Sequence, residues 1–132
     1  MLYNKLDKNT VNMDKNTVIL KRAYYAFNTR NIDAALAVMH PNVIWSNGME
    51  GGYVHGHDGV REYWNKQWQV VDRDIEPISI AADGNGKIVA NVHQVVRDMH
   101  ENIIEDGMVQ HVYLIEDNLI KHMDITRLPL AV

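Results

Sequence analysis

The stretch Gln110-His-Val-Tyr-Leu-Ile-Glu-Asp-Asn-Leu-Ile-Lys-His-Met-Asp-Ile-Thr126 decides the fold of this chain. Two apolar-rich runs flank Asp117-Asn118, and these residue types tolerate the positive φ angles of a two-residue hairpin turn. Counting outward from that turn predicts that His111 faces Asp124. Directly opposed residues on one sheet face have Cβ atoms about 4.5–5.5 Å apart. The sequence therefore predicts an antiparallel hairpin that holds an imidazole beside a carboxylate.

The segments upstream of this hairpin predict helices first and a run of antiparallel strands after them. Apolar residues recur at three- and four-residue spacing in the helical segments, and extended apolar-rich runs bounded by glycine and asparagine mark the strands. This order is typical of an α+β fold in which the helices pack on one face of a sheet. The predicted helices span residues 16–27, 32–39 and 58–71, and the predicted strands span residues 42–47, 75–82, 87–99, 103–115 and 119–126.

Length and composition predict one domain with no cofactor and no metal. The 132 residues carry no cysteine and a net charge of -4, so neither thiolate chemistry nor a basic surface for nucleic acid is expected. No apolar run is long enough to span a membrane, and we expect a cytoplasmic protein. Seven histidines are present, but their spacing does not match a metal site.

The N-terminus repeats one short unit, Asp7-Lys-Asn-Thr-Val11 and Asp14-Lys-Asn-Thr-Val18. Two copies are too few for a repeat fold. We expect residues 1–12 to form a disordered extension and residues 13–132 to form the domain.

Four segments, in this order, carry a resemblance to a known superfamily. They are Phe27-Asn-Thr-Arg-Asn-Ile-Asp-Ala-Ala-Leu36, His40-Pro-Asn-Val-Ile-Trp45, His55-Gly-His-Asp-Gly-Val-Arg-Glu-Tyr-Trp64 and Ile120-Lys-His-Met-Asp124. Over about residues 16–127 the chain resembles the nuclear-transport-factor-2-like superfamily, which includes SnoaL-like polyketide cyclases and ketosteroid isomerase. The resemblance implies a cone, in which a strongly bent sheet wraps on three helices as in a cystatin-like roll and opens over an apolar cavity.

The resemblance favours the cyclase pattern over the isomerase pattern. The isomerase's general base falls on Asn47, its tyrosine on Ala23 and its protonated aspartic acid on His111, so an isomerase mechanism of that kind is not supported. The cyclases carry an acid/base aspartate on the final strand, in a position that resembles Asp124, and His111 would be its partner.

The candidate residues each have a functional and a structural interpretation. Asp124 and His111 form either a general acid/base pair or a buried structural pair. The aromatic candidates are either cavity wall or plain core, and the histidines near the glycine-rich segment are either ligand contacts or turn and cap residues. The strand at residues 87–99 directs either His93 and Arg97 or Gln94 into the cavity. The predicted ligand contacts are Tyr24, Trp45, Asn47, His55, Trp64, Tyr113 and His122.

The leading functional expectation is a cofactor-independent lyase, isomerase or cyclase that abstracts a proton next to a carbonyl in an apolar cavity. The alternatives are a non-catalytic module that binds a small apolar or carbonyl-containing ligand, and a dimerisation domain of the same fold. Both faces of the last hairpin are apolar, which predicts a homodimer through the convex face. The residues expected on that face are Val112, Leu114, Met123 and Ile125.

Overall fold

The computed structural model describes residues 4–127, with side chains for residues 13–126. Within this range, none of the helices is long and apolar enough to cross a membrane. The elements, in chain order, are α1 (Asn4–Asn28), α2 (Ile32–Leu36), β1 (Met39–Ser46), β2 (Tyr53–His55), α3 (Gly56–Val70), β3 (Asp72–Ala82), β4 (Ile88–Arg97), β5 (Ile103–Glu116) and β6 (Leu119–Arg127).

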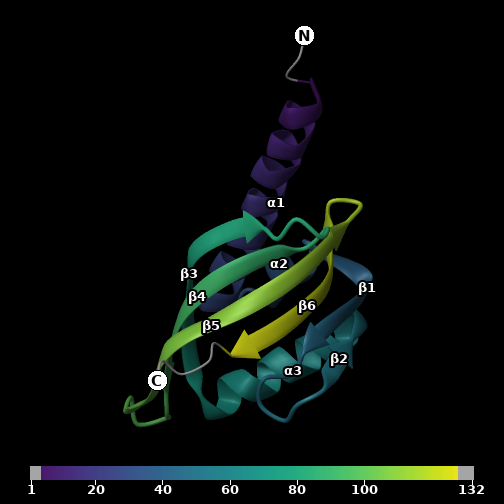
Figure 1. Cartoon of the computed structure of the whole chain (residues 1–132). Coiled ribbons are helices and arrows are strands. Elements are labelled where there is room, and N and C mark those ends of the chain that lie inside the picture. Colours follow the sequence, from purple (N-terminus) through teal and green to yellow (C-terminus); the bar gives the residue numbers. More distant parts are fainter. Residues whose placement is uncertain (1–3, 128–132) are drawn as a thin grey trace.

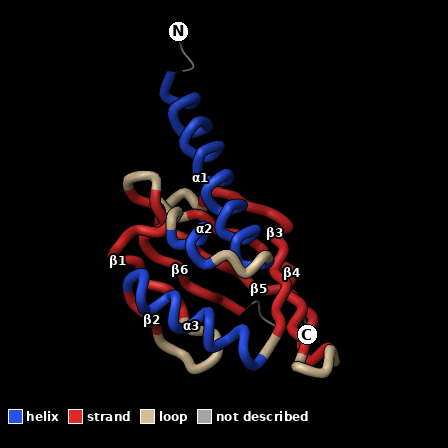
Figure 2. Tube along the Cα trace, turned by 180° about the vertical axis from the view of Figure 1, so that it is seen from behind, coloured by secondary structure: helices blue, strands red, loops and turns tan. Residues whose placement is uncertain are grey.

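The strands form one curved open sheet in the order β2-β1-β6-β5-β4-β3. β1 runs parallel to β6, and every other neighbouring pair is antiparallel. Figures 1 and 2 show the helices on one side of this sheet, with its other side turned away from them. The predicted α+β class, with a bent sheet wrapped on helices from the first half of the chain, is confirmed.

Several element boundaries differ from the sequence prediction, among them that of β3, which begins at Asp72 rather than at residue 75. α1 begins at Asn4 rather than at residue 16, and β1 begins at Met39, where the sequence predicts the end of a helix. β2 lies in the glycine-rich segment, where the sequence predicts no strand; it has three residues, too few to show a period. The disorder predicted for residues 1–12 stays a prediction, because residues 1–3 and the side chains of residues 4–12 lie outside the described part of the chain.

The predicted hairpin turn is confirmed. Asp117 and Asn118 have φ angles of 55° and 62°, the left-handed values that a two-residue turn of this kind requires at both positions. Outside the turn, Glu116 pairs with Leu119 and Ile115 pairs with Ile120, as predicted.

A β-bulge two residues beyond the turn makes the predicted His111–Asp124 pairing wrong. The ladder skips Lys121, so every later pair shifts by one residue. His111 faces Ile125, and Asp124 faces Val112. Successive side chains point to opposite faces of a sheet, so His111 and Asp124 lie on opposite sides of it.

The bulge keeps ionisable side chains out of the apolar side of the sheet. Strict alternation from the buried Ile120 would direct His122 and Asp124 towards the helices, where burying a charge is costly. The extra residue instead directs Met123 and Ile125 inwards. Met123 is 1 % exposed, so the shift in register places two apolar side chains on the inner face where strict alternation would place two ionisable ones.

An aromatic cluster joins the helices to the sheet. Trp64 of α3 is 2 % exposed and its ring packs edge-on against Phe27 of α1, with ring centroids 4.9 Å apart. The same ring contacts Trp45 of β1 at 5.6 Å and Trp68 of α3 at 5.7 Å. Such aromatic pairs add to the free energy gained by burying apolar area, so this cluster holds the wall of the cone in place.

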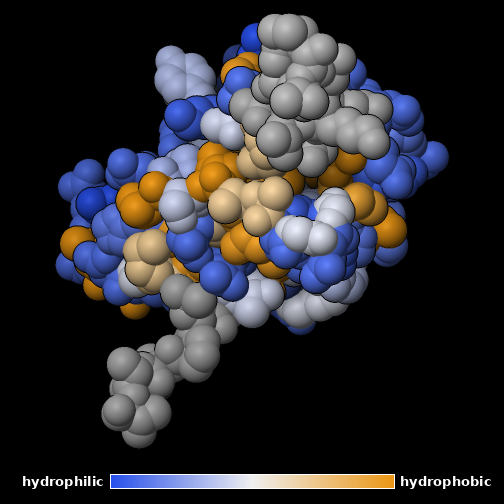
Figure 3. All heavy atoms as spheres, turned by 45° about the horizontal axis from the view of Figure 1, so that its top comes forward, coloured by the Kyte–Doolittle hydropathy of each residue, from blue (hydrophilic) through white to orange (hydrophobic). Residues whose placement is uncertain are grey.

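The outer face of the sheet carries apolar side chains that no helix covers in the described part of the chain. Val112 and Leu114 lie on this face, as predicted, and are half-buried. Met123 and Ile125 do not, because the bulge turns them inwards. Figure 3, which views this side of the molecule obliquely, shows apolar residues gathered among polar ones.

Candidate functional site

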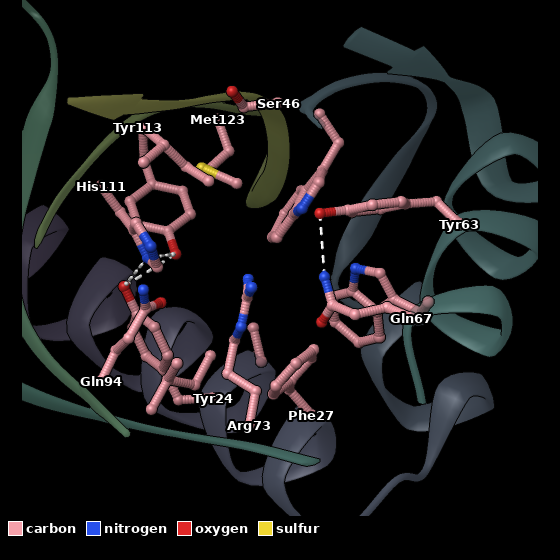
Figure 4. Close-up of a pocket in the computed structure, with 15 residues that line it drawn as sticks. Tyr24, Phe27, Ser46, Tyr63, Gln67, Arg73, Gln94, His111, Tyr113 and Met123 are labelled. Atoms are coloured by element: carbon pink, nitrogen blue, oxygen red, sulfur yellow. Dashed lines mark hydrogen bonds between the residues drawn. The ribbon is translucent and has the colours of Figure 1, made fainter. Parts of the chain in front are cut away.

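A cavity lies on the concave side of the sheet, between α1, α3 and the strands (Figure 4). The space open to the centres of water-sized molecules is about 40 Å³, and roughly 10–15 Å³ on this measure holds one water. A ring-sized ligand therefore requires side chains at the mouth to move. The lining residues are Ala23, Tyr24, Phe27, Trp45, Ser46, Tyr63, Trp64, Gln67, Arg73, Ile75, Gln94, His111, Tyr113, Met123 and Ile125.

A chain of hydrogen bonds runs along one wall of this cavity. The hydroxyl of Tyr113 donates to the hydroxyl of Tyr24 over 2.8 Å, and the Tyr24 oxygen lies 2.9 Å from Nδ1 of His111. Because the Tyr24 proton is then directed at Nδ1, the neutral imidazole carries its own proton on Nε2. Figure 4 shows the three side chains together on one side of the cavity.

Burial keeps every member of this chain uncharged. Desolvation, together with the positive charge of Arg73, lowers the pKa of His111 to about 4. Desolvation also raises the pKa of Tyr24 and of Tyr113 well above the ordinary tyrosine value. At neutral pH the wall therefore presents a neutral imidazole and two neutral phenols.

We expect the neutral state of His111 to make folding stability depend on pH. Its pKa is about 4 in the folded protein and about 6.5 in an unfolded chain, so the unfolded state takes up the proton first as the pH falls. This contribution is complete above pH 6.5 and is lost as the pH falls towards 4. Between pH 7 and pH 5 the loss amounts to about 2 kcal/mol of unfolding free energy.

Urea unfolding of the wild type and of His111→Gln at pH 7 and pH 5 measures this effect. The variant should lose less stability than the wild type over that interval, by about 2 kcal/mol. Equal losses in the two proteins would show that His111 does not titrate in this range.

Five of the nine residues predicted for the site line the cavity. These are His111, Tyr24, Trp45, Trp64 and Tyr113. The side chains of these five residues point in the directions that the strand and helix periodicities predict. The bulge lies in β6 and does not change the periodicity of the elements that carry them.

The other four predicted residues lie elsewhere. The side-chain oxygen of Asn47 accepts hydrogen bonds from the backbone of the next turn, and His55 is exposed at the start of α3. Asp124 and His122 lie on the outer face, with Nε2 of His122 3.0 Å from a carboxylate oxygen of Asp124. The hydroxyl of Tyr53 donates to the same carboxylate. These four side chains do not line this cavity. The bulge sets the direction of His122 and Asp124, and a turn sets that of Asn47.

Arg73 is the most important cavity residue that the sequence analysis missed. It lies on β3, between Asp72 and Asp74, and its side chain points into the cavity (Figure 4). The outward acids bind other cations: Asp72 pairs with Arg30 at 2.9 Å and Asp74 with Arg97 at 3.1 Å. The sequence does contain a sign of this direction. Acidic residues at 72, 74 and 76 alternate with Arg73 and Ile75, and a period of two in a strand places the two sets on opposite faces of the sheet.

The position of Gln94 shows which side chains of the strand predicted at residues 87–99 face the cavity. It is buried and lines the cavity, and its amide nitrogen donates to Glu105 over 2.6 Å. His93 and Arg97 face outwards, where His93 contacts Asp106 at 2.6 Å. Of the two alternatives left open by the sequence, the structure shows the one with Gln94 inside.

Tyr63 and Gln67 of α3 form the wall opposite His111. The Tyr63 oxygen accepts hydrogen bonds from the side chain of Gln67 at 2.9 Å and from the backbone nitrogen of Gly48 at 3.0 Å. Gln67 is 2 % exposed, and its Oε1 has no hydrogen-bond partner in the described part of the chain. Among the described residues, no cluster of three or more His, Asp or Glu side chains is arranged to hold a metal ion.

Solved structures share this architecture. TerC, co-crystallised with polyporic acid, is 22% identical with a TM-score of 0.76, covering 86% of this chain and 91% of its own. A candidate polyketide cyclase from Xanthomonas campestris pv. campestris is 18% identical with a TM-score of 0.74, covering 86% and 90%. A Mycobacterium tuberculosis protein in complex with estradiol-17β-hemisuccinate is 10% identical with a TM-score of 0.71, covering 83% and 90%.

At these identities the structural likeness shows the fold alone. No curated protein sequence matches the chain. Residues 20–123 match the SnoaL-like domain and include the cavity-lining segments of α1, β1, α3 and β3–β5. The chain therefore belongs to the SnoaL-like domain family.

Proposed function

We propose that this protein catalyses, without a cofactor, the transfer of a proton next to a carbonyl group, as an isomerase or cyclase of small conjugated compounds. The observation that carries the proposal is the Tyr113–Tyr24–His111 chain on the wall of an aromatic cavity. It holds one ring nitrogen of His111 by a hydrogen bond and leaves the other for a ligand.

His111 replaces Asp124 as the proposed base, because Asp124 lies on the outer face. The hydrogen bonds between the phenols and Nδ1 can reverse, so that Nδ1 carries the proton and donates to Tyr24 while Nε2 becomes the acceptor. A substrate C–H bond then breaks, its proton moves to Nε2, and its electron pair becomes the enolate. The positive charge of Arg73 stabilises the developing oxyanion. Return of the proton from Nε2 to another carbon completes an isomerisation. In a cyclisation, the enolate carbon attacks a second carbonyl, whose π electrons move to its oxygen, and Nε2 returns the proton to the resulting alkoxide.

A binding module is the second candidate, and two specific observations favour it. No carboxylate is among the cavity-lining side chains in the described part of the chain. The pKa of His111, about 4, makes it a weak base at neutral pH. Only substrates with acidic C–H groups, such as those between two carbonyls, match a base of that strength. The crystallised relatives that hold polyporic acid and estradiol-17β-hemisuccinate are compatible with either function.

Proton–deuterium exchange tests the catalytic proposal. Acetylacetone and dimedone are incubated in deuterated buffer with and without the protein, and loss of the proton signal between the carbonyls is followed by NMR. The proposal expects the protein to accelerate exchange in proportion to its concentration. If exchange stays at the buffer rate for every such compound, the protein is a binding module instead.

We also infer that the protein forms a homodimer through the outer face of β4–β6. The apolar residues of that face include Val112, which lies directly opposite Val89, and the exposed Met108. An uncovered apolar sheet face of this kind marks an interaction surface.

Light scattering should give twice the mass of the chain, and Val112→Glu should give a monomer. A wild-type monomer at micromolar concentration would contradict the inference.

A further inference from the structure

Arg73 places an unbalanced positive charge inside the cavity. The salt bridges of the described residues do not include it, and its Nε is buried without a hydrogen-bond partner there. The acids adjacent to it on β3, Asp72 and Asp74, pair with other arginines on the far side of the strand. A half-buried guanidinium whose Nε is desolvated, and which has no ion pair among the described residues, favours the binding of an anion from outside the chain.

The positive charge of Arg73 affects the pKa of side chains on both walls of the cavity. It contributes to the lowered pKa of His111 on one wall, and it lowers the pKa of Tyr63 on the opposite wall against the larger effect of burial. Figure 4 shows the guanidinium in the space between these walls, with Gln94 on one side and Gln67 on the other. Any ligand inside the cavity therefore lies in a positive potential.

Arg73 also stands where solvent reaches the cavity. Together with Ser46, Gln94 and Ile125 it lines both the inner cavity and a depression outside it, in which about 230 Å³ is open to the centres of water-sized molecules. Gly48 lies at this boundary, and a Cβ there would come within 3.9 Å of Nη1 of Arg73 and 3.1 Å of Ile125. The glycine thus leaves room beside the guanidinium, and an anion can reach it from the surface.

We propose that Arg73 binds a planar oxyanion of the ligand, a carboxylate or an ionised enol, so that this protein selects small acidic ring compounds over their neutral analogues. The guanidinium presents its N–H groups as a planar fork, which matches two oxygens of a delocalised anion. The flat body of the ligand lies between the aromatic walls of the inner cavity, and the anionic end lies at the mouth. This assignment rests on the cavity of the proposed function but not on its chemistry.

Benzoate and benzamide test this site, because they have nearly the same shape and differ in charge. NMR titration should show that the wild type binds benzoate about ten-fold or more tightly than benzamide, as expected for a charge-assisted hydrogen bond. Arg73→Met should remove this preference, because it should weaken the binding of benzoate much more than the binding of benzamide. Arg73→Lys, which keeps the charge but loses the fork, should retain part of it.

Arg61→Met is the matched control. It removes the same charge from α3, where Arg61 pairs with Asp33 at the surface at 2.8 Å, and it should preserve the full benzoate preference. Thermal unfolding without ligand gives a second readout: Arg73→Met should be at least as stable as the wild type, because it removes a partly desolvated charge that has no ion pair among the described residues. A clearly lower melting temperature would show instead that Arg73 is held by the protein, and would overturn the proposal.

The outcomes separate this site from the proposed catalysis. A benzoate preference that depends on Arg73, without any deuterium exchange, establishes an acid-binding module. Exchange without a benzoate preference leaves proton transfer in place and eliminates the anion site. Equal binding of benzoate and benzamide by the wild type, or a preference that survives in Arg73→Met, overturns the proposal directly.

Discussion

Replacement of His111 by glutamine should lower the catalysed exchange rate of an acidic dicarbonyl compound by about 100-fold or more, the usual contribution of a positioned acid/base group. Glutamine can still accept the hydrogen bond from Tyr24 through its amide oxygen, so the wall keeps its packing. It cannot take up the substrate proton. The loss should therefore lie in the rate of exchange rather than in the affinity for the compound, and saturation kinetics followed by NMR separate the two.

Asp124→Asn is the control for this prediction, because it changes the carboxylate that the sequence alone predicted as the base. Its side chain contacts Tyr53 and His122 on the outer face, so exchange should stay close to the wild-type rate. The reverse result, with exchange lost in Asp124→Asn and kept in His111→Gln, would eliminate His111 as the base.

Truncation of Trp64 to alanine should destabilise the protein by about 3–5 kcal/mol, the range for removing a large buried aromatic side chain. Trp64 is 2 % exposed and contacts aromatic rings from α1, β1 and α3. Since natural domains are stable by only about 5–15 kcal/mol, the variant should unfold at markedly lower urea concentration.

Trp68→Ala provides the comparison within the same helix. Trp68 is half-buried, and the guanidinium of Arg30 lies 5.8 Å from the centre of its ring at the surface. Its removal creates a smaller cavity, so the loss in unfolding free energy should be clearly smaller than for Trp64→Ala. A larger loss for Trp68→Ala would show that the cluster is not centred on Trp64.

The sequence predicted the fold well because its strongest signals are local. The Asp117-Asn118 turn and the apolar periodicity of α3 each follow from the conformational preferences of a few neighbouring residues. The same signals placed Tyr24, Trp45, Trp64, Tyr113 and His111 on the correct faces of their elements.

The site was predicted less well because direction on a strand depends on register. The change of phase in β6, from Ile120 to Met123 and Ile125, was a readable sign of a bulge, since the apolar positions move from even to odd numbers. Arg73 was missed for a different reason: it falls in the gap left between the helix predicted to end at residue 71 and the strand predicted to begin at residue 75. The bulge and Arg73 were both missed for related reasons. In each case the side chains that reach the cavity depend on where a strand begins or on which residues of it face inwards, and not on whether the segment is a strand.

The bulge at Lys121 also has a consequence for how function is inherited among relatives of this fold. Insertion or deletion of one residue between the hairpin turn and the end of β6 exchanges the set of side chains that faces the cavity for the set that faces outwards, because the side-chain period of a strand is two. A lineage can thus lose an interior carboxylate without substituting it. Aligning such relatives residue by residue would then match identical aspartates that lie on opposite sides of the sheet, and would transfer a catalytic role to a surface position.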